Sequence, residues 1–189
     1  MVQWATAASR LGNQLIAVNP KLLIFVGGGS QDYYPPYATS FWGTNMQGIN
    51  LRPVVINNAP NRVVYSPHIY GPSVYMQWYF LPDNFNASLG ARWTNDFGYI
   101  RSHNLGTIVI GEFGTKLTPG KPLIWWQTLV KYMKSQGLTD YMHWSYNPTS
   151  SDTDSIVGSD WKTPNKAMLD YLAMINPAGT VITPQDVLS

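Results

Sequence analysis

Four short apolar runs, separated by segments with helical spacing, constrain the fold of this chain more than any other feature. The runs are Leu22–Val26, Arg62–Ser66, Thr107–Ile110 and Tyr141–Trp144. Short continuous apolar runs are typical of strands that are buried on both faces of a parallel sheet. Because helical segments separate them, we predict an α/β fold with parallel strands, outer helices and right-handed crossovers.

The helical segments cover residues 4–18, 88–101, 121–137 and 164–174. The first carries apolar residues at helical spacing, namely Trp4, Ala7, Ala8, Leu11, Leu15 and Ile16. The second places Leu89, Trp93, Phe97 and Ile100 on one face. The third has Pro122 in its first turn and ends at Gly137. Neither a linker nor a low-complexity segment divides these elements, so we predict one domain over residues 1–189.

The composition argues against several classes of protein. The net charge of +2, without a run of Lys or Arg, does not favour nucleic-acid binding. Cysteine is absent, which excludes disulfides and thiolate chemistry. The chain lacks an apolar run of the roughly 18 residues that a membrane span needs. Met1 and Val2 lead directly into a helical pattern, so we expect no signal peptide in this chain.

Aromatic residues are abundant, with eight Trp, twelve Tyr and six Phe. Aromatic faces suit sugar rings, whose C–H groups stack on them while the hydroxyls bind fixed polar groups. Core packing is the alternative explanation and is expected to account for many of these side chains.

Glu112 is the only glutamate of the chain and follows the buried run Thr107–Ile110. The carboxyl end of a parallel strand is a usual location for catalytic groups in α/β folds. The alternative is a solvated charge at a junction between a strand and a loop.

Other catalytic and binding motifs are absent or incomplete. The Gly27–Ser30 segment lacks the remaining elements of a dinucleotide or phosphate loop, so we interpret it as a flexible turn. The sequence contains neither the Gly-x-Ser-x-Gly elbow nor the His-Glu-x-x-His pattern. Asp152, Asp154 and Asp160 lack the other ligands of a calcium loop, and we interpret them as turn formers. We therefore expect no cofactor and no bound metal.

Three separated motifs carry a resemblance to a known family. They are Val-Tyr-Ser-Pro-His-Ile-Tyr at 64–70, Val-Ile-Gly-Glu-Phe-Gly at 109–114 and His-Trp-Ser-Tyr-Asn-Pro at 143–148. In order and position they resemble the last three strands of glycoside hydrolase family 5, especially its bacterial endo-β-1,4-glucanases, or cellulases. The run at 22–26 and Trp-Gly-Thr-Asn at 42–45 also fit, so the likeness covers nearly all of the chain.

The resemblance implies a TIM (β/α)8 barrel of which this chain is the C-terminal (βα)4 half. Residues 1–189 would correspond to the fourth helix through the eighth strand and helix. Glu112 resembles the catalytic nucleophile, and Tyr70 the phenol expected to donate a hydrogen bond to it. His68 resembles a residue lining the cleft. Trp144 resembles the floor beneath the cleaved sugar, and Trp42 a sugar platform.

The chain departs from the family in lacking the asparagine–glutamate pair that supplies the acid/base after the fourth strand. Retaining glycosidases use two carboxyl groups about 5–5.5 Å apart. With one glutamate, the isolated chain is expected to hydrolyse β-1,4-glucan weakly or not at all. The alternative is a non-catalytic scaffold or carbohydrate-binding protein.

Four parallel strands alone would leave both edge strands open. We therefore expect self-association, as a homodimer or larger oligomer in which two half-barrels close one pseudo-barrel. The other expected partner is a β-glucan oligosaccharide, with neither nucleic acid nor membrane. The family resemblance implies a secreted, extracellular protein.

Overall fold

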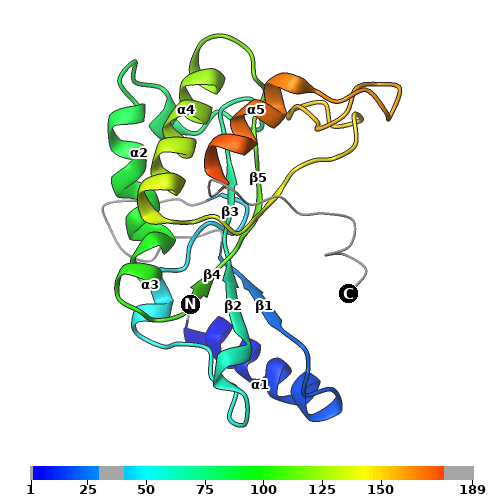
Figure 1. The fold of residues 1–189 in the computed structure, drawn as a ribbon. Coiled ribbons are helices and arrows are strands. Elements are labelled where there is room, and N and C mark those ends of the chain that lie inside the picture. Colours follow the sequence, from blue (N-terminus) through cyan, green and yellow to red (C-terminus); the bar gives the residue numbers. More distant parts are fainter. Residues whose placement is uncertain (1, 30–40, 177–189) are drawn as a thin grey trace.

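The computed structural model describes residues 2–29 and 41–176, whose strands all run parallel (Figure 1). The first strand is β1, Ile24–Gly27. The second has two parts, β2 (Val63–Ser66) and β3 (His68–Tyr70). The third also has two parts, β4 (Thr107–Ile108) and β5 (Ile110–Gly114). The fourth is β6, Tyr141–His143.

Neighbours in the sheet follow the chain order. The lower half of the sheet has the order β1-β2-β4 and the upper half has the order β3-β5-β6. Hydrogen bonds continue across the breaks, because Val109 N donates to Tyr65 O and Gly111 N to Pro67 O, both at 3.0 Å. The four predicted strands are therefore present, and the second and third extend further than expected.

The register of the sheet separates a covered face from an open one. Val26 pairs with Tyr65 and Tyr65 with Ile108, and all three are buried. On the opposite face Phe25 is half-exposed, although its register partner Val64 is buried. Helices α2 (Asn86–Trp93), α3 (Tyr99–Ser102) and α4 (Lys121–Gln136) lie along one side of the strands (Figure 1). We call the buried side the helix-covered face and the other side the open face.

The four helical segments are also present. They are α1 (Val2–Val18), the interrupted segment 86–102, α4 (Lys121–Gln136) and α5 (Lys166–Ile175). Helix α4 begins with Pro122 in its first turn and ends at Gly137, whose φ of 62° is left-handed, as glycine allows. Short 3-10 turns lie at η1 (Gln47–Asn50), η2 (Pro60–Arg62) and η3 (Trp78–Phe80). No helix among the described residues is long and apolar enough to cross a membrane.

The predicted apolar face of α1 is partly wrong. Ile16 is buried, but Leu11 is 57% exposed and Leu15 is 41% exposed. Instead, Ser9 and Asn13 contact the irregular segment at 55–57, where they hydrogen-bond the backbone of Val55 and Asn57. The reason is that irregular backbone close to the core needs hydrogen-bond partners, which apolar side chains cannot supply.

The second helix is interrupted, although the sequence predicts it as continuous. It consists of α2 (Asn86–Trp93), the π-turn η4 (Thr94–Gly98) and α3 (Tyr99–Ser102). The four apolar residues predicted to share a face are all buried. The π-turn buries three consecutive residues at 96–98.

The core lies between the helices and the strands. Phe113 and Trp126 are fully buried, with ring centroids 5.6 Å apart. His143 packs against both, at 5.5 Å and 5.8 Å. Burial lowers the pKa of His143 to about 4, and neither ring nitrogen has a hydrogen-bond partner among the described residues. His143 is therefore a neutral core residue at neutral pH.

The glycine-rich segment after β1 packs closely against a second loop. A Cβ atom on Gly28 would lie 2.3 Å from the carbonyl oxygen of Gly43. Gly29 pairs with Asn45 in an isolated antiparallel bridge. Close backbone contact, rather than the predicted flexibility, therefore accounts for Gly28. Ser30, the last residue of the predicted turn, lies outside the described residues.

Candidate active site

Three predicted site residues meet at the carboxyl ends of two adjacent strands. His68 on β3 is in register with Glu112 on β5. Tyr70 Oη donates a hydrogen bond of 2.5 Å to Glu112 Oε2, and His68 Nδ1 lies 3.5 Å from the same oxygen. The side chains of His68 and Glu112 are 31% and 33% exposed. The carboxylate is thus held on one side and remains accessible to a ligand.

Tyr70 is a neutral donor to this carboxylate. Burial, followed by the hydrogen bond and charge of Glu112, raises the pKa of Tyr70 above its ordinary value of 10. The phenol therefore keeps its proton at neutral and moderately alkaline pH.

Local backbone features make room for this arrangement. A Cβ atom on Gly111 would lie 2.1 Å from Ser66 Oγ and 3.0 Å from His68 Nε2. Glycine is therefore required where the His68 ring crosses β5. The pairing of β5 with β6 also shifts register between Ile110 and Phe113, at the position of Glu112. Such irregularities re-aim side chains near active sites.

Trp144 follows β6, the strand next to Glu112. Its backbone N–H donates to Phe113 O at 3.0 Å, which extends the ladder by one residue. Because His143 faces the core, Trp144 points to the open face, where it is half-exposed. The structure thus places Trp144 on the strand beside the carboxylate.

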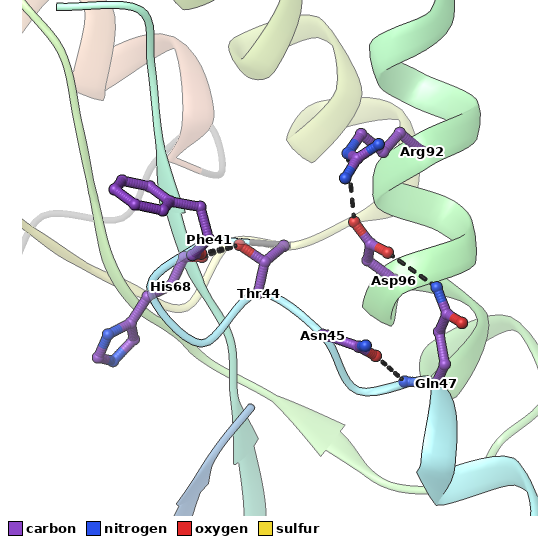
Figure 2. Close-up of polar contacts among 7 residues, drawn as sticks. All are labelled: Phe41, Thr44, Asn45, Gln47, His68, Arg92 and Asp96. Carbon is purple, nitrogen blue, oxygen red and sulfur yellow. Dashed lines mark hydrogen bonds and ion pairs between the residues drawn. The ribbon is translucent and has the colours of Figure 1, made fainter. Parts of the chain in front are cut away.

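Trp42 lies on the loop after β1, which is hydrogen-bonded to the strand of His68. His68 N donates to Gly43 O at 3.3 Å. Thr44 Oγ1 lies 2.6 Å from His68 O and 2.7 Å from Phe41 O (Figure 2). Trp42 is more than half exposed and has a left-handed φ of 52°. The roles predicted for Trp42, Trp144, Glu112, Tyr70 and His68 stay predictions.

Trp42, Phe41 and Tyr75 form an aromatic group that the sequence did not reveal. The rings of Phe41 and Trp42 meet edge-on at 5.0 Å, and Phe41 stacks on Tyr75 at 5.1 Å. Tyr75 belongs to the segment after β3, which also contains Trp78, Tyr79 and Phe80. Its side-by-side position with the loop of Trp42 depends on tertiary contacts.

The three aspartates have structural roles. Asp160 Oδ1 accepts hydrogen bonds from the backbone N–H groups of Lys162 and Thr163. The Thr163 hydroxyl bond and these backbone bonds lower the pKa of Asp160 to about 2. Asp152 Oδ1 accepts locally from Ser150 Oγ. Asp160 and Asp152 therefore make the turn contacts predicted.

Asp154 differs, because its contact crosses between two loops. Its Oδ2 accepts from the backbone of Leu117 at 2.5 Å, so it ties the loop after β6 to the loop after β5. Across residues 2–29 and 41–176, no group of three or more His, Cys, Asp or Glu side chains is arranged to hold a metal.

A buried ion pair behind the site was also missed. Arg92 Nε lies 3.7 Å from Asp96 Oδ2, and the side chains are 4% and 0% exposed (Figure 2). A sequence signal existed. Both residues stand one position before an apolar residue of the buried helix face, at a spacing of four.

The fold and the site together define a half-barrel of parallel strands and helices with a carboxylate at its strand ends. The chain matches the model of the cellulase family, glycosyl hydrolase family 5, over residues 1–150. It belongs to this family, as predicted.

Relatives of the chain include bacterial endoglucanases. An endoglucanase of Paenibacillus polymyxa is 38% identical over 177 residues, which cover 91% of this chain and 43% of the relative. The major extracellular endoglucanase of Xanthomonas campestris is 37% identical over 174 residues, covering 89% of this chain and 35% of the relative. The chain therefore spans less than half the length of these relatives.

Solved structures lead to the same family. An endocellulase of Pyrococcus horikoshii in complex with cellotetraose is 36% identical, with a TM-score of 0.82 over 92% of this chain and 48% of that one. The catalytic domain of the Xanthomonas campestris enzyme is 34% identical, also with a TM-score of 0.82, over 91% of this chain and 49% of that one. The prediction of a half-barrel is confirmed.

Proposed function

We propose that these residues are the C-terminal half of a retaining endo-β-1,4-glucanase whose nucleophile is Glu112. The observation that carries the proposal is the hydrogen bond from Tyr70 to a partly exposed carboxylate at the carboxyl end of a parallel strand. Similarity to endoglucanases supports the substrate class.

In this mechanism a Glu112 oxygen attacks the anomeric carbon of the glucan. The bond to the leaving sugar breaks, and its oxygen takes a proton from a second carboxyl group. Water then attacks the glycosyl–enzyme ester, gives its proton to that second group and releases Glu112. Tyr70 would hold the carboxylate oriented, and His68 would line the cleft. Trp144 and Trp42 would stack on sugar rings.

The second carboxyl group is proposed to lie outside these residues, because Glu112 is their only glutamate. Residues 1–189 would be one domain, equivalent to the fourth helix through the eighth strand and helix of the barrel. By themselves they would hydrolyse unactivated glucan weakly or not at all. Secretion is proposed from the relative that is named as extracellular.

Covalent labelling tests the nucleophile without needing the second carboxyl group. The probe is a 2-deoxy-2-fluoro-cellobioside that carries a dinitrophenolate leaving group. This leaving group departs without protonation, and the glycosyl–enzyme ester then accumulates. We expect mass spectrometry to find the label on Glu112. Asp170→Asn, which removes an exposed carboxylate on α5, should leave labelling unchanged. Glu112→Gln should abolish it, and a label on any other residue would refute the assignment.

The second candidate is a non-catalytic, self-associating half-barrel that binds carbohydrate. The open face favours it, because Phe25, Met142 and Trp144 are half-exposed there and β1 and β6 are edge strands. Two copies could pair β1 of one with β6 of the other.

Two measurements distinguish these candidates. Sedimentation of residues 1–189 should give a dimer or larger species if the second candidate is right, with tryptophan fluorescence changing on addition of cellotetraose. Adding the N-terminal half of a family 5 barrel as a separate chain should restore hydrolysis if the first is right. A folded monomer would contradict self-association.

A further inference from the structure

We infer that the buried Arg92–Asp96 pair positions the sugar cleft by holding the loop at residues 41–47, which carries Trp42 and is bonded to His68. Neither residue would touch the substrate. The inference rests on the proposed function for its sugar-binding readout, but its structural part stands on contacts in the described residues alone.

The pair lies at an unusual place in the helix. Asp96 is in the π-turn η4, and Arg92 is one turn earlier in α2. Single π-turns inside helices are rare and are frequent at functional sites. Burying two charges costs several kcal/mol per ion, so a buried pair is weak support for stability. These features favour a role beyond stabilising the helix.

Asp96 holds one end of the 41–47 loop. Its Oδ1 accepts from Gln47 Nε2 at 3.1 Å, and its backbone carbonyl accepts from Met46 N at 2.8 Å. Tyr99, on the same helical segment, donates to Met46 O at 2.7 Å. Asn45 Oδ1 accepts from Gln47 N at 2.8 Å and braces the turn (Figure 2).

The other end of the loop contacts β3, the strand that carries His68. Gly43 O accepts from His68 N, and Thr44 Oγ1 hydrogen-bonds His68 O. Gln47 lies only three residues after Thr44 in the sequence. The loop is therefore a short connection between the buried pair and the backbone of His68, and Trp42 projects from it.

Arg92 contacts the aromatic segment after β3. Its guanidinium carbon lies 3.9 Å from the centre of the Tyr79 ring and 5.9 Å from that of Trp78. A cavity of about 10 Å³, roughly the size of one water, is lined by Arg92, Asp96, Thr44, Tyr79 and Tyr70, among others. The pair thus lies next to the loop of Trp42, next to the segment after β3 that contains Tyr79, and next to Tyr70.

Asp96→Asn in the intact enzyme tests the inference. Asparagine keeps the volume and the acceptor oxygen for Gln47 but removes the charge facing Arg92. We expect KM for cellotetraose to rise about 5-fold to 10-fold, with kcat changing less than 2-fold, because Trp42 loses its fixed position. Asp170→Asn makes the same change in the exposed Lys166–Asp170 pair, also at a spacing of four, and should leave KM unchanged.

A double-mutant cycle identifies the route of the effect. If Asp96 acts through Trp42, Asp96→Asn should raise KM little further in a Trp42→Ala background. Additive effects would overturn the inference, as would a lower Tm with unchanged KM. If Asp96→Asn fails to fold, Gln47→Leu cuts the same connection from the loop side and keeps both members of the ion pair.

Hydrogen exchange separates failure of this inference from failure of the proposed function. Asp96→Asn and Gln47→Leu should speed amide exchange at Met46 and His68. The Val109 amide, which bonds Tyr65 O in the same sheet, should be unaffected. If the wild type neither binds nor cleaves cellotetraose, the proposed function fails, and faster exchange at His68 still supports the connection. Unchanged exchange at His68 overturns it.

Discussion

The two faces of the four-stranded sheet differ in how deeply their side chains are buried. On the helix-covered face, Phe113, Trp126 and His143 pack together and exclude water. On the open face, Glu112 and Trp144 alternate with Phe113 and His143 along the third and fourth strands and remain accessible. A single strand therefore carries a core residue at one position and an accessible side chain at the next.

The two histidines on these strands make the same contrast. His143 is desolvated among aromatic rings, and burial lowers its pKa to about 4. His68 is about one-third exposed and faces the Glu112 carboxylate at 3.5 Å. Residue type alone does not separate a core histidine from a site histidine. The two histidines differ in which face of the sheet their side chains occupy.

The largest expected effect lies on the open face. Glu112→Gln in the intact enzyme should lower turnover of β-1,4-glucan by about 10⁴-fold or more, because it removes the attacking oxygen. The free energy of unfolding should change by about 1 kcal/mol or less, since the side chain is partly exposed. Rates on carboxymethyl-cellulose and urea unfolding measure the two quantities. Retained turnover would break the assignment of chemistry to this face.

The reverse is expected on the helix-covered face. Trp126→Ala should lower the free energy of unfolding by about 3–5 kcal/mol, because the indole is fully buried and donates to Thr115 O at 2.8 Å. Trp161→Ala, which truncates a half-exposed indole, should cost about 1 kcal/mol or less. Urea denaturation compares them. Equal costs would show that burial does not set the contribution of these two indoles to stability.

A smaller effect is expected from acid. The folded pKa of His143, about 4, lies below its unfolded value of 6.5, so the unfolded state binds the proton more tightly. Its contribution to stability is present above pH 6.5 and is lost as pH falls toward 4, by roughly 3 kcal/mol. His143→Gln should flatten this part of the curve of unfolding free energy against pH. His103→Gln, at an exposed site, should leave it in place.

The smallest effect concerns the donor to the carboxylate. Tyr70→Phe should lower kcat/KM by about 10-fold to 100-fold, the range for losing a hydrogen bond to a charged group. The raised pKa of Tyr70 means that the wild type should not lose activity through this phenol near pH 10. Tyr75→Phe removes a more exposed hydroxyl and should have less effect. Equal losses in both variants would deny Tyr70 a special role.

Local pattern predicted the elements and the strand ends well. The runs that precede Glu112 and Tyr70 were located because apolar continuity marks a buried strand wherever it lies in the fold. The same reasoning failed for Leu11 and Leu15 on α1, because the contact face there is chosen by unpaired backbone at 55–57. Periodicity does not report such a neighbour.

Side-chain groupings required the tertiary structure. The contact of Phe41 with Tyr75 joins two loops that are separated by the second strand. Helix propensity does not predict the π-turn at Thr94–Gly98. This turn contains Asp96, which is buried and hydrogen-bonded to Gln47.

The sequence by itself determined that four βα units follow one another, that one carboxylate ends the third strand, and which family those motifs match. These properties depend on residues close together in the chain. Only the tertiary structure decided which face α1 buries, that Phe41 stacks on Tyr75, and that a buried ion pair contacts the loop of Trp42. Those depend on register and on contacts between distant segments, whose energies no local pattern encodes.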